Sequence, residues 1–376
     1  MVADIEELVC CESPSEDLGA VARSAEVVAK VGARHLGAEP ERIVVDGCTH
    51  LRWRFGPAPR VLVLGHHDTV WPLQSLRSHP FQVTDGVLRG PGCFDMKAGL
   101  VMAFHALGGL ADLSGVTVLV TGDEETGSAS SRALIEAEAR QCDAVLVLEA
   151  AAPGGALKTE RKGVSRYEIL VTGRAAHSGL EPHRGVNATV EAAHQVLAVC
   201  GLAEPQAGTT VTPTRLTSGT TVNTVPAAAA FGIDVRVPTD AEQHRVDEAI
   251  RTLRPALPDA QVQVTGGPNR PPLTRDASEA LYATAARLAD EIGVGPVSSA
   301  AVGGGSDGNF TAGIGTPTLD GLGAAGGGAH ADDEHVLVSE LLPRTRLLEA
   351  LVKELLANGC REPRSNPGQP VLRHEP

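Results

Sequence analysis

Three short apolar runs of the sequence, at residues 61–64, 116–120 and 145–148, each end in acidic or imidazole side chains. Runs of this length and composition are typical of buried strands. In a sheet of parallel strands the carboxyl ends lie along one edge, where ligands bind. We therefore expect these side chains to come together although they are far apart in the sequence. They are His66, His67, Asp68, Asp123, Glu124, Glu125 and Glu149.

The composition of these strand ends indicates a metal site. Each end alone could be an ordinary exposed terminus, because charged residues are mostly exposed. Together, however, they hold imidazole and carboxylate groups and no lysine or arginine. Clustered carboxylates repel one another unless a cation lies among them. Carboxylate plus imidazole is the ligand set of zinc or a similar divalent ion.

Two loops add candidates to this set. Asp95 lies in the segment RGPGCFDMKAG, directly before an expected helix, so a role as helix N-cap is the alternative to metal binding. His330 follows the glycine-rich segment GLGAAGGG, which could bring a ligand into place. A lone loop histidine is otherwise an ordinary surface residue, so His330 is a candidate only together with the others.

Strand geometry separates the two histidines of the segment GHHDTV. Successive side chains of a strand point to opposite faces, so His66 and Asp68 share a face and His67 points away. A metal-bound imidazole needs a partner that fixes its tautomer, and a carboxylate on the same face can provide it. We therefore expect His66 to be a ligand, Asp68 its support, and His67 to pack or face solvent.

The order of expected elements predicts the fold class. Apolar runs that alternate with helical segments predict an α/β fold, with a mostly parallel sheet covered by helices on both faces. A change to polar–apolar alternation near Gly163, followed by β-α-β-β-α-β order, predicts an inserted α+β, ferredoxin-like domain. We expect a catalytic domain at residues 1–162 and 268–361, the inserted domain at 163–267, and a disordered tail at 362–376.

Charge and cysteine content limit the classes of partner and location. The chain of 376 residues has a formal net charge of -14, which argues against nucleic acid or an anionic membrane surface as the main partner. We see no signal peptide and no membrane-spanning run. The seven cysteines are scattered without CxxC spacing, so we expect neither a disulfide framework nor a cysteine zinc site. A reducing, cytoplasmic location is the resulting expectation.

Seven segments, in order along nearly the whole chain up to about residue 360, resemble motifs of one enzyme family. They are GHHDTV, GPGCFDMKAG, TGDEETGS, VLEA, GRAAHSG, VNTVP…DVR and GAHADDEHV. The family is that of the co-catalytic zinc peptidases and deacylases. It includes bacterial glutamate carboxypeptidase, acetylornithine deacetylase, succinyl-diaminopimelate desuccinylase and the aminoacylases. The resemblance is strongest to glutamate carboxypeptidase.

The resemblance implies two zinc ions per subunit, although cobalt or manganese could use the same ligands. His66, Asp95 and Glu149 would hold one ion. Asp95, Glu125 and His330 would hold the other, so that Asp95 bridges the pair. The next position, where many members have a second acid, varies in the family and is methionine in this chain.

The resemblance also implies catalytic and substrate-binding roles. Glu124 would be the general base, and Asp68 the orienting carboxylate. In this family the inserted domain mediates dimerisation, and the histidine that matches His177 reaches into the active site of the partner subunit. Asn223 and Arg236 match positions that contact substrate, and the fork of Arg236 suits a free carboxylate because it binds two oxygens at once. The alternative for Arg236 is an ordinary surface arginine.

Two other motifs give rival interpretations. GGSDG fits the G-x-S-x-G pattern, and Asp320 and His330 follow Ser306 in the chain order of a serine hydrolase triad. No long helical pattern follows Ser306, however, and the metal-type motifs would be left without a role. GLGAAG, at residues 321–326, matches a dinucleotide fingerprint but lacks the helix that this fingerprint requires.

The sequence therefore predicts a metallohydrolase that uses a dizinc-activated water, with Glu124 as general base. The expected substrate is a small molecule with a free carboxylate next to the scissile amide, at the C-terminal amino acid of a peptide or in an N-acyl amino acid. Removal of an acetyl or succinyl group from an amino acid is the alternative. A non-enzymatic binding module would not need Glu124. We expect a homodimer formed through the inserted domain, and neither nucleic acid nor a membrane as partner.

Overall fold

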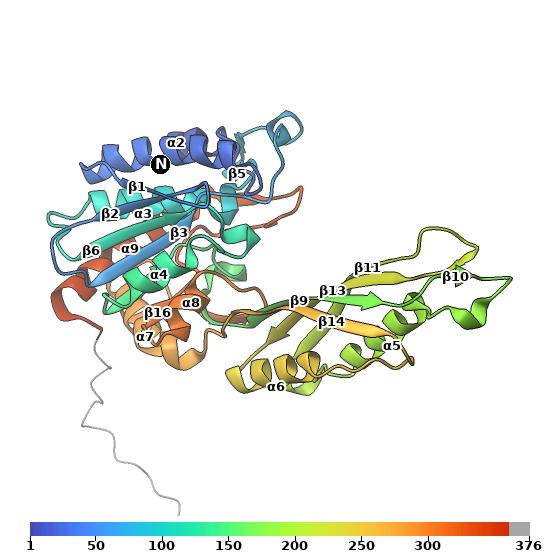
Figure 1. Cartoon of the computed structure of the whole chain (residues 1–376). Helices are drawn as coiled ribbons and strands as arrows, with labels where there is room; N and C mark the ends of the chain where they lie inside the picture. The colour runs from blue at the N-terminus through green and yellow to red at the C-terminus, as the bar shows by residue number, and fades with distance from the viewer. Residues whose placement is uncertain (361–376) are drawn as a thin grey trace, which may run out of the picture. The chain divides into compact units, whose positions relative to one another are not determined.

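The computed structural model describes residues 1–360, and these divide into two compact units (Figure 1). The larger unit contains residues 1–159, 276–300 and those described from 316 onward. The smaller unit contains Glu160–Arg275 and Ala301–Gly315.

The bounds of the smaller unit differ from those expected for the inserted domain. Its main span extends beyond 163–267 at both ends, and residues 301–315, expected in the catalytic domain, group with it. Asn309, on this segment, donates hydrogen bonds to the backbone oxygens of Lys162 and Pro271 at 3.1 and 2.7 Å, which explains the grouping. The expected tail at 362–376 lies outside the described residues.

The larger unit is built on a six-stranded sheet in the order β1-β2-β6-β3-β7-β16. β3, β6, β7 and β16 are parallel to one another. β2 runs antiparallel to β6, and the edge strand β1 runs antiparallel to β2. The mostly parallel α/β class is thus confirmed. The strands are β1 (Glu41–Val45), β2 (Cys48–Arg54), β3 (Val61–His66), β6 (Val116–Thr121), β7 (Ala144–Val147) and β16 (Thr318–Leu319).

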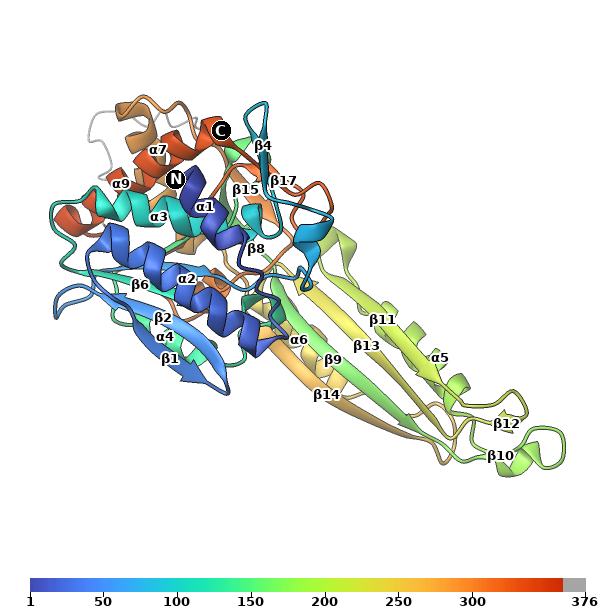
Figure 2. The same ribbon diagram turned by 90° about the horizontal axis from the view of Figure 1, so that it is seen from above.

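Helices cover both faces of this sheet. α2, α3 and α9 lie on one face and α4 on the other (Figures 1 and 2). β3 and β6 are buried along their whole length because both faces are covered, which is why they read as unbroken apolar runs. The helices of this unit are α1 (Val2–Val9), α2 (Leu18–Leu36), α3 (Ala98–Gly108), α4 (Arg132–Ala139), α7 (Arg275–Glu291) and α9 (Val338–Asn358).

Local signals account for the ends of α2. The side chain of Asp17 accepts a hydrogen bond from the backbone N–H of Ala20 at 2.8 Å and so caps the start of the helix. Gly37 ends it with a φ of 68°, a left-handed conformation that glycine adopts without steric cost.

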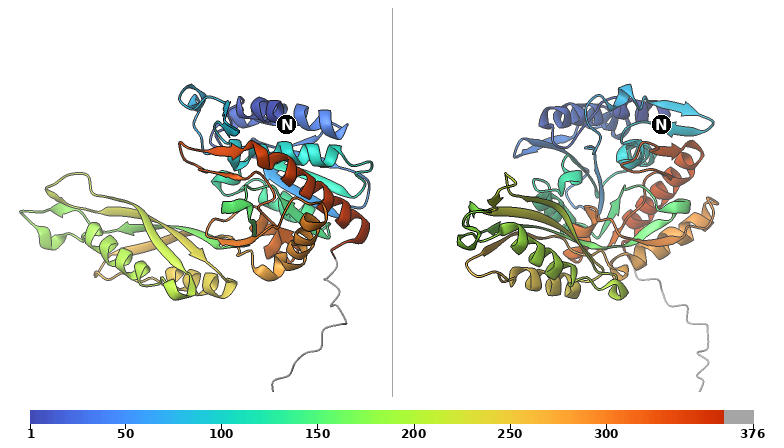
Figure 3. Two further views of the ribbon diagram at one scale, coloured as in Figure 1. Left: turned by 180° about the vertical axis from the view of Figure 1, so that it is seen from behind. Right: turned by 90° about the vertical axis from the view of Figure 1, so that its right-hand side faces the viewer.

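The smaller unit is an antiparallel four-stranded sheet in the order β11-β13-β9-β14. α5 and α6 pack on one face of it (Figure 3). The predicted β-α-β-β-α-β order and α+β class are confirmed. Tyr167, Ile169 and Val171 of β9 are buried because they point to the helices. The main elements are β9 (Gly163–Thr172), α5 (Ala188–Cys200), β11 (Thr210–Ser218), β13 (Ala228–Val237), α6 (Asp240–Arg251) and β14 (Gln261–Arg270).

The remaining strands and the remaining α-helix are short. They are β4 (Gln82–Thr84), β5 (Val87–Arg89), β8 (Leu157–Arg161), β10 (Ala176–His177), β12 (Thr224–Val225), β15 (Ser299–Val302), α8 (Gly308–Gly313), β17 (Gly326–Gly327) and β18 (His335–Leu337). Within residues 1–360, no helix is both long and apolar enough to span a bilayer.

Candidate metal centre

His66 is the last residue of β3, and only 1% of its surface is exposed. Its Nε2 lies 3.4 Å from Oδ1 of Asp95 and 3.5 Å from Oε1 of Glu149. The other ring nitrogen, Nδ1, lies 3.0 Å from the backbone oxygen of Asp68. A carbonyl only accepts, so Nδ1 donates its proton to it, and Nε2 is the ring nitrogen that faces the carboxylates and could bind a metal ion.

The support for His66 thus differs in detail from the expectation. The backbone oxygen of Asp68 contacts Nδ1, while the carboxylate Oδ1 lies 3.4 Å away. The buried carboxylate of Asp68 also accepts hydrogen bonds from the Ser15 hydroxyl at 2.6 Å and from the backbone N–H groups of Glu124 and Glu125, both at 3.2 Å. Asp68 therefore positions the turn that carries both glutamates.

A second group forms around His330. Its Nε2 lies 3.3 Å from Oδ2 of Asp95 and 3.2 Å from Oε2 of Glu125. Asp95 therefore faces His66 with one oxygen and His330 with the other. In each group, His66–Asp95–Glu149 and Asp95–Glu125–His330, the candidate ligand atoms all lie within 4.8 Å of one another.

These residues fit divalent metal ions. Among the described residues, Nε2 of His66, Oδ1 of Asp95 and Oε1 of Glu125 are buried atoms that make no hydrogen bond. Buried polar atoms without a partner are costly, and a cation among them would satisfy all three. The carboxylates of Asp95 and Glu125 accept hydrogen bonds from the His330 imidazole and raise its pKa to about 10. This shift reflects the negative potential that would attract a dication.

Glu334, which belongs to neither group of candidate ligands, holds the loop that carries Asp95. One carboxylate oxygen of Glu334 accepts from the backbone N–H groups of Phe94 and Asp95, at 2.8 and 3.0 Å. The other accepts from the Gly92 N–H at 2.9 Å and the Trp71 indole at 2.6 Å. Glu334 is only 4% exposed. It follows His330 by four residues and therefore joins the two ligand-bearing loops.

The alternative role of Asp95 as a helix cap does not hold. α3 begins at Ala98 with Lys97 at its N-cap, and Asp95 lies in the preceding tight turn, Cys93–Lys97.

Asp123, which we grouped with the strand-end acids, instead holds its own loop. Its carboxylate accepts from the Ser130 N–H and hydroxyl, both at 2.7 Å, and from the Ser131 hydroxyl at 2.6 Å.

The remaining predicted site residues lie in the smaller unit. His177 is exposed on β10, which pairs with β12 directly after Asn223. The backbone N–H of Ser178 donates to the oxygen of Asn223 at 3.0 Å, so these two predicted residues are close neighbours. Arg236, on β13, is engaged by Asp234 through two hydrogen bonds, Nε–Oδ1 at 2.7 Å and Nη2–Oδ2 at 2.9 Å.

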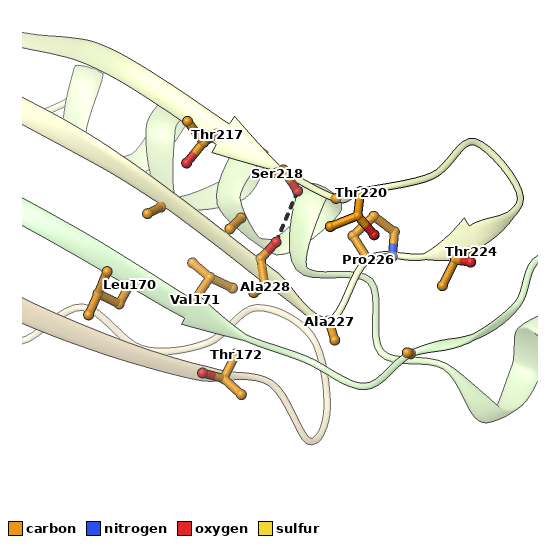
Figure 4. Close-up of a pocket in the computed structure, with 14 residues that line it drawn as sticks. Leu170, Val171, Thr172, Thr217, Ser218, Thr220, Thr224, Pro226, Ala227 and Ala228 are labelled. Carbon is orange, nitrogen blue, oxygen red and sulfur yellow. Dashed lines mark hydrogen bonds between the residues drawn. The ribbon is translucent and has the colours of Figure 1, made fainter.

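A pocket of about 500 Å³ lies beside the ends of β9, β11 and β13 in the smaller unit (Figure 4). It is lined by aliphatic, hydroxyl and backbone groups, including Leu170, Thr217 and Ala228, and by no ionisable side chain. It therefore offers no carboxylate, imidazole or thiol, the groups that most often transfer protons or bind transition-metal ions.

The serine hydrolase interpretation has little support in this geometry. Ser306 is fully buried, and its Oγ accepts a hydrogen bond from the N–H of Gly308 at 3.1 Å. The helix directly after it, α8, has only six residues. His330, the supposed base, instead contacts carboxylates of the candidate metal centre.

Comparison with known proteins agrees with this geometry. The family model described as Peptidase family M20/M25/M40 matches residues 62–354, a span that includes all five candidate ligands. The chain belongs to this family. The resemblance stated from the motifs is thereby confirmed, and so is the assignment of the chain to the metallopeptidase and amidohydrolase enzymes.

Relatives within the family differ in the reactions that their names describe. Carboxypeptidase G2 from a Pseudomonas species is 32% identical over 308 residues, which cover 78% of this chain and 74% of that protein. Succinyl-diaminopimelate desuccinylase from Thioalkalivibrio sulfidiphilus is 28% identical over 368 residues, which cover 91% and 94% respectively.

Solved structures show the same fold. Aminopeptidase PepT from Bacillus cereus has a TM-score of 0.73 at 23% identity, covering 94% of this chain and 97% of that one. A metallo-carboxypeptidase of the M20 family from Sulfolobus solfataricus has a TM-score of 0.75 at 14% identity, with 93% and 97% covered.

The two adjacent histidines should respond differently to substitution. His67 is fully buried, and its ring nitrogens lie 3.2 Å from the Ser24 hydroxyl and 3.1 Å from the Thr49 backbone oxygen. His67→Ala should therefore lower stability by about 2–4 kcal/mol through a cavity and an unpaired oxygen, yet keep its metal. His66→Ala should lose metal. Thermal unfolding and metal analysis of both variants test this, and metal loss in His67→Ala alone would contradict the assignment.

Glu334→Gln should weaken zinc binding although Glu334 is not itself a ligand. Each carboxylate oxygen of Glu334 accepts from two N–H groups. In glutamine an NH₂ group replaces one of these oxygens, and it would face two N–H donors from which it cannot accept. Loss of support behind a ligand typically costs 10–100-fold in metal affinity. Competition with a chromophoric chelator measures the affinity. Asp332→Asn is the matched control, because the side chain of Asp332 lies in the same loop and is 93% exposed. Equal affinity in the two variants would refute a supporting role for Glu334.

Proposed function

We propose that this chain is a dizinc hydrolase that cleaves an amide bond next to a free carboxylate, with Glu124 as general base. The observation that carries the proposal is the arrangement around Asp95, whose two oxygens face two separate imidazole–carboxylate groups. Two divalent ions bound in this way would lower the pKa of a shared water and supply a nucleophile at neutral pH.

Glu124 is well placed to move the proton of that water. It is the neighbour of the candidate ligand Glu125 in the chain, and it is only 8% exposed. Its backbone is held by Asp68, which also supports His66. A carboxylate fixed beside the centre can take a proton from water and return it to the leaving nitrogen.

His177 would act as a hydrogen-bond donor to the developing oxyanion. The backbone N–H groups of Gly179 and Leu180 both donate to its Nδ1, at 3.2 Å. This arrangement keeps the proton of the neutral ring on Nε2, which is then available to donate. Asn223, its neighbour, would contact the substrate.

Arg236 would bind the free carboxylate of the substrate. Its fork already holds one carboxylate, that of Asp234, with the two-oxygen geometry that such a ligand needs. Substrate binding at this position would therefore require the guanidinium to leave Asp234 or to share its donors.

We propose that the smaller unit forms a homodimer. Several of its aliphatic side chains are largely exposed, and edge strand β11 offers unpaired backbone groups. The exposed side chains are Leu180 (75%), Leu197 (72%) and Val222 (104%). In such a dimer, His177 would serve the active site of the partner.

All seven cysteines are free thiols, which fits a reducing cytoplasmic setting.

Release of an amino acid from a peptide, as the name of carboxypeptidase G2 describes for that relative, is our first choice of reaction. The higher identity to that protein, 32% against 28% for the desuccinylase, supports this order. Deacylation of an N-acyl amino acid is the second candidate, because it breaks the same bond type beside the same carboxylate.

A panel of dipeptides and N-acyl amino acids, assayed on zinc-loaded protein by released amine, tests the proposal. We expect turnover of at least one carboxylate-bearing amide. Glu124→Gln should keep zinc and lose activity by roughly 10²–10⁴-fold, the usual contribution of a general base. Glu125→Gln, the matched variant one residue away, should lose zinc. Absence of turnover across the panel, or equal zinc loss in both variants, would count against the assignment.

A further inference from the structure

A second cluster of metal-type side chains lies where α1, α2 and α3 meet in the larger unit. It consists of Asp4 on α1, His35 on α2 and His105 on α3. Nε2 of His105 lies 2.7 Å from Oδ2 of Asp4, and Nε2 of His35 lies 3.2 Å from the same oxygen. The two imidazole rings are adjacent, with centroids 4.0 Å apart.

We propose that these three residues bind a divalent transition-metal ion such as zinc, at a site separate from the candidate metal centre. Their ligand atoms all lie within 4.8 Å of one another. Around tetrahedral zinc, neighbouring nitrogen and oxygen ligands are about 3.3 Å apart, given bond lengths of about 2.0–2.1 Å. The distances from Asp4 to the two imidazoles therefore need only small adjustments, and water would fill the fourth position.

The surroundings orient the carboxylate for this role. Arg34 donates to Oδ1 of Asp4 at 3.2 Å, and Oδ2 is left facing the two imidazoles. A second contact that fixes a ligating carboxylate is typical of protein metal sites. The side chains are half-buried, with 15% of Asp4, 24% of His35 and 27% of His105 exposed, so an ion can enter from solvent.

Positive charges nearby limit the affinity. Arg34 faces the cluster, and the α-amino group of Met1 lies 3.6 Å from Oδ2 of Asp4. Arg34 is partly balanced by Glu7, at 2.9 Å. An ion would replace the two imidazole protons that now bind Oδ2, because a ligating imidazole must be deprotonated at the bound nitrogen. Without an ion, the same residues form a hydrogen-bonded cluster around Oδ2 of Asp4.

An ion at this cluster would connect α1 to α2 and α3. The chain that follows α1 supports the candidate metal centre, since the Ser15 hydroxyl binds Asp68 and the backbone oxygen of Cys11 accepts from Lys97. Zinc at the cluster would therefore stabilise the position of α1 and this segment. The cluster and the candidate metal centre are separate sites along α3. His105 lies seven residues after the first residue of α3, about 10 Å along the helix, whereas Asp95 precedes the helix.

Equilibrium dialysis of the full chain against micromolar Zn²⁺ tests the proposal directly. The double variant His35→Gln/His105→Gln should bind one zinc ion fewer per chain than the unsubstituted protein and should keep its hydrolase activity. The matched control is His194→Gln/His244→Gln, which removes two exposed histidines from helices of the smaller unit. It should bind as much zinc as the unsubstituted protein.

The outcome does not depend on the proposed function, because the measured quantity is a difference of one ion between variants. Equal zinc binding in the unsubstituted protein and the double variant would overturn the proposal. Asp4→Asn covers the case in which the double variant does not fold. It keeps the shape of the side chain and should likewise lose one ion, together with the increase in thermal unfolding temperature that zinc confers through this site. An unchanged zinc-induced increase in Asp4→Asn would also overturn the proposal.

Discussion

The carboxylate of Asp95 is the group on which the candidate metal centre depends. It is held between His66 and His330, and further carboxylates of Glu125 and Glu149 lie within reach of the same imidazoles. Three acids gathered in a largely buried space repel one another unless positive charge is placed among them. Protonated imidazoles can supply part of that charge, but two dications supply it more completely and satisfy the buried atoms that make no hydrogen bond.

This concentration of charge explains why the surrounding framework is so heavily hydrogen-bonded. Strand β3 fixes only His66, whereas the other candidate ligands lie on turns and loops that packing alone would hold loosely. Two buried acids that are not ligands compensate. Asp68 binds the backbone of the glutamate turn, and Glu334 binds the backbone of the Asp95 loop. Such pre-positioning matters because metal sites lose affinity when their ligands are free to move.

Much of this arrangement could be predicted from the sequence because its main signals are local. The apolar runs that form β3, β6 and β7 are buried on both faces, and they end where the ionisable residues begin. Alternation along the strand distinguished His66 from His67, which packs in the interior as one of the two outcomes expected for it. The α+β order of the smaller unit followed from alternation of the same kind.

Other features depend on contacts between distant segments, which a single sequence does not encode visibly. Nothing in the segment ADDEH distinguishes buried Glu334 from the exposed Asp332, because burial there depends on the loop around residue 92. The hairpin of β1 and β2 was not anticipated, since its outer strand is largely exposed and lacks a long apolar run. The pairing of Arg236 with Asp234 was also missed, although both lie on one face of β13.

Anomalous diffraction at the zinc absorption edge, on crystals of the zinc-loaded protein, is the most direct test of the central claim. We expect two zinc peaks about 3.5–4 Å apart, one on each side of the Asp95 carboxylate. One peak would be bound by His66 and Glu149, and the other by Glu125 and His330. A single peak at this centre, or two peaks without Asp95 between them, would contradict the account.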